Sequence, residues 1–340
     1  MKGRTVFLDH IGEREAAALM VDGRLEDLLI DNDQPRPGTI YRAVADRPVK
    51  GQGGMFLRTP DGSAFLRQVK GLAPGQRLIV QVTGYAEPGK AIPVTQKVLF
   101  KSRYAIVTPG APGMNLSRSI RDDDERDRLL GVAHEVMPED VGGLILRSSC
   151  AGADEDEIAD DIIAMVDLAR QVAADDGDEP EKLLEGDGPH LLAWREWTEP
   201  AEIVTGEGCF EDHEIVDLID ELNHSKAALP GGASLFIEST RALVAVDVNT
   251  GRDTSPAAGL KANTNAARDL PRQLRLRGLG GQITLDLAPM PKKDRRGFET
   301  ALRAAFRADS IETILAGWTP LGHFELQRKR DRLPLAELLS

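Results

Sequence analysis

The feature that most constrains this chain is an aspartate inside a valine-rich strand pattern. Residues 243–249 alternate in polarity, which predicts a strand with Asp247 and Asn249 on one face and three valines on the other. Aspartate is disfavoured in strands, and a buried carboxylate has to be paired, protonated or bound to a cation. Asp286 repeats the anomaly near the end of a second predicted strand at 282–287. Any fold for this chain has to accommodate both acids.

Between the two strands, residues 263–277 have the pattern of a helix that stops at the glycine-rich segment 278–281. A strand–helix–strand unit favours parallel strands whose carboxyl ends lie on the same edge of the sheet. We therefore expect Asp247 and Asp286 side by side at the mouth of the sheet, where α/β proteins bind ligands. Two carboxylates and the Asn249 amide oxygen form a ligand set suited to Mg²⁺ or Mn²⁺.

A purely structural interpretation of the two acids remains open. Asp247 could cap the end of its strand or pair with Arg252. Asp286 could pair with Arg275 or Arg277. Two acids at equivalent strand ends, followed by a strongly basic segment, favour a metal site instead.

At this point four segments together resemble the catalytic core of the RNase E/G endoribonucleases. They are VDVNTGR at 246–252, RQLRLRGLGG at 272–281, ITLDLAPM at 283–290 and LGHFELQRKR at 321–330, in the family's order and spacing. The resemblance implies that Asp247 and Asp286 bind one catalytic Mg²⁺, for which Mn²⁺ can substitute. It also implies that Asn249 orients the metal-bound water or the phosphate.

The resemblance further implies an α+β multidomain fold. An OB-fold (S1-like) RNA-binding barrel is inserted in an RNase H-like subdomain, and a DNase I-like α/β catalytic domain follows. The expected division is 1–35 for the first part of the RNase H-like subdomain, 36–103 for the OB-fold domain, 104–187 for a 5′-sensor-like module, 188–232 for a truncated RNase H-like remainder and 233–340 for the catalytic domain.

Residue patterns agree with parts of this division. Residues 36–103 contain five short alternating segments separated by glycine turns, which is typical of an OB-fold barrel. Residues 175–188, rich in acids and glycine, have the composition of a polar linker.

Candidate RNA contacts fall in three places. In the barrel, Phe56 and Phe65 lie where the family presents aromatics for base stacking, although a core role is equally open, and Lys90 could meet a phosphate. The resemblance matches Arg147 to the arginine that grips a 5′-monophosphate, with an ion pair to a nearby acid as the alternative. The remaining candidates are Ser148, which stands where the family usually has threonine, Arg118 as a second anion contact, and the basic residues Lys292, Lys293, Arg295 and Arg296 that follow Asp286.

Charge and composition limit the function classes. The net charge of −13 argues against a nucleic-acid binder, but residues 121–190 alone carry −16 and residues 268–307 hold ten basic residues against four acids. This distribution suits a polyanionic substrate steered to one face. Phosphate-binding glycine motifs of nucleotide-dependent enzymes do not occur, and the six histidines are scattered without pairing.

We therefore expect a Mg²⁺-dependent endoribonuclease, a hydrolase of RNA processing or decay. Metal-activated water would cleave single-stranded RNA, in some cases 5′-monophosphorylated, to 5′-phosphate and 3′-hydroxyl ends. The rival is a non-catalytic RNA-binding protein of the same fold, which retention of Asp247, Asn249 and Asp286 disfavours.

Assembly and location are bounded only broadly. Cys150 and Cys209 form no paired metal motif, and the family's zinc link is not matched, so no zinc is expected and the protein is a monomer or homodimer. No run of 18 apolar residues and no signal-peptide core occur, which predicts no membrane partner and a cytoplasmic location.

Overall fold

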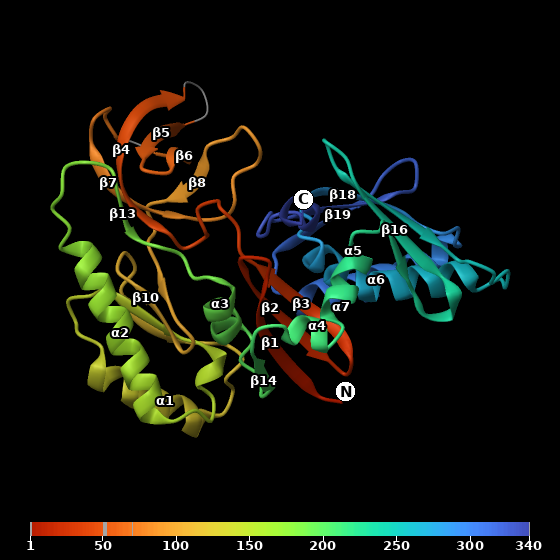
Figure 1. Cartoon of the computed structure of the whole chain (residues 1–340), viewed down its shortest axis with the longest axis horizontal. Coiled ribbons are helices and arrows are strands. Elements are labelled where there is room, and N and C mark those ends of the chain that lie inside the picture. Colours follow the sequence, from red (N-terminus) through yellow and green to blue (C-terminus); the bar gives the residue numbers. More distant parts are fainter. Residues whose placement is uncertain (1, 50–52, 70, 340) are drawn as a thin grey trace. The chain divides into compact units, whose positions relative to one another are not determined.

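The computed structural model describes residues 2–49, 53–69 and 71–339, and the chain has a mixed α+β fold (Figure 1). Contacts divide it into two units, one of Met1–Asn32 with Ala201–Ser340 and one of Asp33–Pro200. The second unit is thus an insertion, in chain order, between the third and fourteenth strands of the molecule. The limits of the five predicted domains stay predictions.

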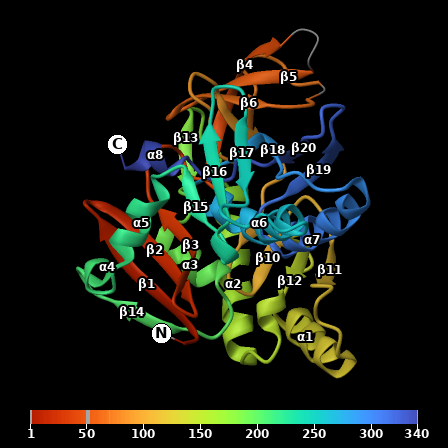
Figure 2. The same cartoon turned by 90° about the vertical axis from the view of Figure 1, so that its right-hand side faces the viewer.

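The first unit is built on a six-stranded sheet in the order β15-β16-β17-β18-β20-β19. Its strands are β15 (Lys226–Ala228), β16 (Ser234–Ser239), β17 (Val244–Asn249), β18 (Gly281–Asp286), β19 (Thr313–Trp318) and β20 (Phe324–Arg328). Helices α6 (Ala258–Leu276) and α7 (Arg295–Ala308) cover one face of this sheet (Figure 2). The three valines of β17 are buried there with leucines and phenylalanines of the two helices.

Helix α6 differs from its prediction at one end. It begins at Ala258, five residues before the predicted start, and its last residue is Leu276. Pro271 lies inside the helix and is one of its buried residues. The early start brings Gly259 so close to the segment after β18 that an added Cβ would lie 2.0 Å from the Pro289 carbonyl oxygen.

A second sheet of the same unit has the order β14-β1-β2-β3. Strands β1, β2 and β3 follow one another in the chain and pair antiparallel, and residues from the predicted remainder of this subdomain supply β14, which pairs in parallel with β1. Phe210 and Ile215 are fully buried against this sheet. The elements are β1 (Arg4–Ile11), β2 (Arg14–Val21), β3 (Arg24–Ile30), β14 (Glu202–Thr205), α4 (Cys209–Asp212), α5 (Ile215–Leu222) and α8 (Leu335–Leu338).

The second unit contains a closed five-stranded barrel, consistent with an OB-fold. Strands pair in the order β4-β5-β6-β8-β7, and β7 pairs back with β4. Their bounds are β4 (Ile40–Val49), β5 (Gly54–Thr59), β6 (Gly62–Leu66), β7 (Arg77–Val82) and β8 (Ile92–Thr95). The prediction of five barrel strands is confirmed.

The acidic segment 175–188 is not a free linker. It contains β13 (Glu181–Leu184), which pairs antiparallel with β4. The buried Arg42 side chain of β4 makes ion pairs with Asp175 and Glu181, so charge complementarity fixes a segment whose composition alone suggests disorder.

The rest of the second unit is a four-stranded sheet, β11-β12-β10-β9, packed against α1 and α2. Both helices begin at an aspartate cap, Asp122 and Asp154, followed by acids in the first turn where the helix dipole favours them. The bounds are β9 (Phe100–Lys101), β10 (Ala105–Thr108), β11 (Gly113–Leu116), α1 (Asp123–Val136), β12 (Gly143–Leu146), α2 (Glu155–Ala173) and α3 (Pro189–Glu196).

Candidate functional site

The two anomalous acids are direct partners in the parallel pairing of β17 with β18. Asp247 lies opposite Asp286 in the register, at the carboxyl end of each strand. The prediction that they lie side by side is confirmed. Both are exposed, because α6 and α7 cover only the apolar face of the sheet.

Asn249 completes the group. Its Nδ2 donates a hydrogen bond of 2.9 Å to Oδ2 of Asp247, which is possible because residues two apart in a strand share a face. Asp286 does not form the ion pair with Arg275 or Arg277 that the structural interpretation allowed, because both arginines have other partners. Arg275 is engaged by Glu26, Asp27 and Asp309, and Arg277 donates to main-chain carbonyls.

The register extends the pair into a line across the exposed face. Lys226 lies opposite Phe236, Phe236 opposite Asp247, and Leu285 opposite Phe324, which places His323 beside Asp286. His323 Nε2 is 3.8 Å from Oδ1 of Asp286. We call Lys226, Phe236, Asp247, Asp286 and His323 the transverse row.

Sequence analysis missed three members of this row, namely Lys226, Phe236 and His323. Strand alternation places Phe236 on the face opposite its buried neighbours Leu235 and Ile237. Alternation says nothing about which strands are neighbours, however. The row depends on strand order, which no local pattern in this sequence gives.

Buried polar contacts hold the carboxyl end of β18 in place. The Asn263 side chain of α6 is fully buried, donates to the Ala288 carbonyl at 2.8 Å and accepts from the Ala288 amide at 3.0 Å. It thus satisfies both backbone groups of a residue two positions beyond Asp286. A polar residue at this core position fixes where the strand ends.

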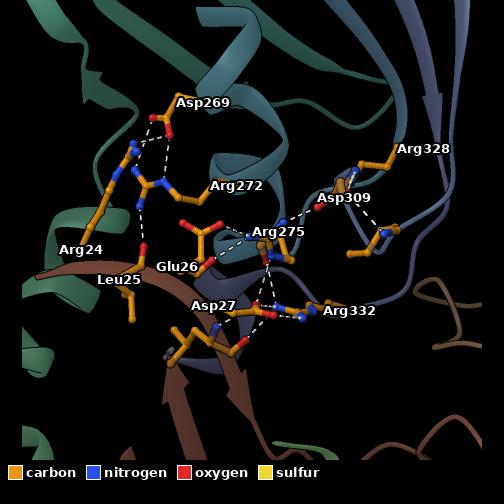
Figure 3. Close-up of polar contacts among 12 residues, drawn as sticks. Arg24, Leu25, Glu26, Asp27, Asp269, Arg272, Arg275, Asp309, Arg328 and Arg332 are labelled. Atoms are coloured by element: carbon orange, nitrogen blue, oxygen red, sulfur yellow. Dashed lines mark hydrogen bonds and ion pairs between the residues drawn. The ribbon is translucent and has the colours of Figure 1, made fainter. Parts of the chain in front are cut away.

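An ion-pair network anchors the sheet at the other end of β18, away from Asp286 (Figure 3). Arg328 of β20 donates to Asp309 at 2.7 Å, and Asp309 also accepts from Arg275 of α6. Arg275 in turn contacts Glu26 and Asp27 of β3. Because the side chains of Asp309 and Arg328 are 1% and 0% exposed, this pairing is enclosed in the protein.

The acids and amide fit a divalent cation in part. Carboxylate and amide oxygens are Mg²⁺ ligands, and Mg²⁺ commonly takes only one or two carboxylates, with water and substrate phosphate completing six positions. Over the described ranges, no group of three histidine, cysteine, aspartate or glutamate side chains is arranged to hold a metal ion. A cation at Asp247 and Asp286 would thus keep several positions for water and phosphate.

The basic residues after Asp286 lie at the start of α7. Lys292 and Lys293 are exposed in a 3-10 turn, Lys292–Asp294, and Arg296 is exposed in the first turn of the helix. Arg295 instead stacks on Trp318, with its guanidinium carbon 4.1 Å from a ring centroid. Three of the four predicted phosphate contacts are therefore open to solvent, and the fourth contacts an aromatic ring.

In the barrel, Phe56 and Phe65 are register partners on β5 and β6, with ring centroids 5.3 Å apart. Both are partly exposed on the outer surface, while their strand neighbours fill the barrel core. The Arg47 guanidinium carbon lies 5.1 Å from the Phe56 centroid. A core role for the two rings is wrong, and a stacking role stays a prediction.

Two other predicted anion contacts lie on the surface. Lys90 is exposed and forms an ion pair of 2.8 Å with Glu87, three residues away. Arg118 is exposed in the turn between β11 and α1. Both side chains are therefore open to solvent.

Arg147 takes the alternative role that the sequence left open. Its Nη2 donates to Oε2 of Glu196 at 2.7 Å, and its Nη1 donates to the carbonyls of Ser102 and Arg195. Ser148, next in the chain, is exposed. A phosphate at Arg147 would have to compete with the Glu196 carboxylate.

Glu196 is held by three cations. Lys101 and Arg195 contact Oε1 at 2.7 and 2.8 Å, in addition to Arg147 at Oε2. Partial burial alone would raise the pKa of Glu196, but the hydrogen bond from Lys101 and the nearby positive charges lower it to about 2. Burial lowers the pKa of Lys101. Glu196 is therefore ionised throughout the neutral range.

Comparison with known proteins identifies relatives along nearly the whole chain. The profile of the Ribonuclease E/G family matches residues 100–200 and 195–331. Ribonuclease G of Salmonella typhimurium and ribonuclease G of Escherichia coli K12 are each 27% identical, over 98% of this chain and 81% of the relative. Ribonuclease E of Nostoc is 26% identical over 96% of this chain and 56% of its own length.

No helix within the described part of the chain is both long enough and apolar enough to cross a membrane.

Proposed function

Because the chain belongs to the Ribonuclease E/G family, we propose that Asp247, Asn249 and Asp286 form the hydrolytic centre with which this endoribonuclease cleaves single-stranded RNA. The observation that carries the proposal is the direct pairing of the two acids at the exposed carboxyl end of parallel strands. Family membership supports an RNA substrate and hydrolysis of its backbone. It also supports the finer assignment of RNase H-like and DNase I-like subdomains in the first unit.

Each residue has a distinct task in this proposal. Asp247 and Asp286 hold one Mg²⁺ or Mn²⁺ from adjacent strands, and Asn249, fixed by its hydrogen bond to Asp247, orients the water or the phosphate. Such a cation supplies a water of lowered pKa and neutralises charge that develops on the phosphate. Hydrolysis by a water activated in this way would give 5′-phosphate and 3′-hydroxyl ends.

The RNA strand needs contacts beyond the acids. Phe56 and Phe65, paired on the outer face of the barrel, present ring faces on which unpaired bases can stack. Lys292, Lys293 and Arg296 present positive charge six or more residues beyond Asp286. Stacking requires splayed bases, which supports selection of single strands.

A preference for 5′-monophosphorylated RNA is the finer part of the proposal. Arg147, with the exposed Ser148 beside it, could bind a terminal phosphate only after Glu196 releases the guanidinium. We therefore propose that the wild-type protein has only a weak preference for 5′-monophosphorylated RNA.

The experiment that tests the centre compares Asp247→Asn and Asp286→Asn with the wild type on an end-labelled single-stranded RNA in Mg²⁺. Loss of a group that merely supports a metal ligand costs about 10–100-fold, so loss of a ligand should cost at least that much. Glu238→Gln, at an exposed position of β16, is the matched control and should cleave normally.

Two measurements separate catalysis from binding. Both Asn variants should retain the melting temperature and RNA affinity of the wild type, and Mn²⁺ bound to the wild type should give an electron paramagnetic resonance signal that they lose. Wild-type turnover in either variant contradicts the centre. RNA binding without cleavage in the wild type supports the rival function, a non-catalytic RNA-binding protein.

A further inference from the structure

Phe236 lies in the transverse row but has no role in the proposed hydrolytic centre. Phe236 is the direct register partner of Asp247, on the side away from Asp286. Neighbouring strands lie about 4.8 Å apart, so the ring stands one strand from the first acid and two from the second. It is the apolar side chain of this row.

Phe236 is not a core residue. Leu235 and Ile237 on either side are buried at 0% and 4% exposure, whereas Phe236 is only partly buried and faces away from α6 and α7. Strand phase therefore presents the ring on the face that carries the acids. Packing of the sheet against its helices does not explain a phenylalanine there.

The surroundings of the ring are polar. Its neighbours on the same face of β16 and β17 include Glu238, Asp247 and Asn249. Lys226 of β15 lies opposite it, with Nζ 6.0 Å from the ring centroid. Protein-docking surfaces are contiguous apolar patches, whereas a single aromatic face with a neighbouring cation is the arrangement that stacks a nucleobase.

We infer that Phe236 and Lys226 form a nucleotide subsite beside the hydrolytic centre. Phe236 stacks the base adjoining the phosphate held at Asp247 and Asp286, and Lys226 contacts the next phosphate of the strand. The ligand is one unpaired nucleotide of RNA, read by its ring face and not by its base identity. This inference rests on the proposed function, because the acids define where the cleaved phosphate lies.

The subsite has a consequence for substrate choice. A base can stack on Phe236 only when it has left a duplex, so the catalytic sheet itself would reject paired RNA at the cleavage position. Selection of single strands would then be independent of the barrel. The row is also asymmetric, with Phe236 flanking Asp247 and His323 flanking Asp286, so only the nucleotide on the Asp247 side is stacked.

A base-deletion cycle tests the subsite. The affinity of single-stranded oligonucleotides is measured, each with one abasic nucleotide at a different position. Two proteins are compared, Asp286→Asn, which does not cleave, and the double variant Asp286→Asn with Phe236→Leu. Stacking of one base on an aromatic ring corresponds to about 5–150-fold in affinity. We expect a loss of this size when the base at one position is deleted, a similar loss with Phe236→Leu, and no further loss when both changes are combined.

Two further variants separate stacking from other effects. Phe236→Trp should restore the affinity that Phe236→Leu loses, because the larger ring stacks as well. Ile314→Ala, an exposed apolar position at the edge of the same sheet, is the matched control and should leave affinity unchanged. Lys226→Ala should reduce the salt dependence of binding by about 0.7 in the logarithmic slope, the contribution of one phosphate on a single strand.

The outcomes are distinct. Equal affinity of the wild type and Phe236→Leu for every oligonucleotide overturns the subsite, as does a loss that is the same at all abasic positions or that accompanies a lower melting temperature. If the wild type does not cleave RNA but the abasic cycle still shows coupling at one position, the hydrolytic proposal fails and the subsite stands.

Discussion

Replacement of Asp309 by asparagine should destabilise the first unit strongly. Asp309 accepts from Arg328 and from Arg275, and its side chain and that of Arg328 are 1% and 0% exposed. Asparagine keeps the shape but removes the charge, which leaves the Arg328 guanidinium buried without a counterion. Nε and Nη2 of Arg328 already lie buried with no hydrogen-bond partner among the described residues, so the cation depends on Asp309.

The expected magnitude follows from this enclosure. Breaking a buried ion pair by removing one partner costs about 3–5 kcal/mol, because the remaining charge is uncompensated. Arg275 retains Glu26 and Asp27, so the cost falls mainly on Arg328. For a unit of 150–250 residues, about 2–4 °C per kcal/mol applies, which gives a fall in melting temperature of roughly 6–20 °C.

Hydrogen exchange with mass spectrometry shows which strands lose stability in this variant. Peptides from β18 and β20 should lose protection in Asp309→Asn, while peptides from the barrel serve as the internal control. Asp331→Asn is the matched variant, because Asp331 pairs with Lys329 at 2.6 Å on the surface and should cost under about 1 kcal/mol. A change in melting temperature as small as that of Asp331→Asn would refute the claim that the network is enclosed.

Three further predictions concern other parts of the molecule. Glu196→Gln should raise the preference for 5′-monophosphorylated over 5′-hydroxyl RNA by about tenfold or more in a binding assay, because it frees Arg147, and unchanged preference would show that Arg147 only holds α3. Burial opposes ionisation of Asp27, but the charges of Arg332 and Arg275 lower its pKa below 3.8. The stability that ionised Asp27 contributes is therefore present above pH 3.8 and is lost as the pH falls through the lowered pKa. Acid unfolding should therefore be shallower in Asp27→Asn, and identical pH profiles would contradict the assignment. Phe65→Leu should weaken binding of single-stranded RNA by about 5-fold or more without changing the melting temperature, and a fall in melting temperature would return the ring to a packing role.

Local patterns predicted the elements that alternate or repeat clearly. The alternation at 243–249 gave the face of Asp247 and Asn249, and the intervening helix gave the parallel pairing with Asp286. Five glycine-separated segments gave the barrel. In these cases the information lies within a few residues of the feature.

The remaining features depend on partners distant in the chain. Phe236 and His323 enter the row only through strand order, and β13 is held by the ion pair between its Glu181 and Arg42. The exposure of Asp247 depends on which sheet face the helices cover. Composition and periodicity carry no information on such pairings.

The insertion of one unit into the other has a consequence for biosynthesis. Strand β1 obtains its parallel neighbour β14 only when residues 202–205 have been made, after the whole of Asp33–Pro200. At about 5–20 residues per second, this edge of β1 stays unpaired for roughly 10–40 s on the ribosome. An unpaired edge is a template for wrong strand pairing. The nascent chain is therefore most exposed to aggregation, and most in need of a chaperone, while its inserted unit is being synthesised.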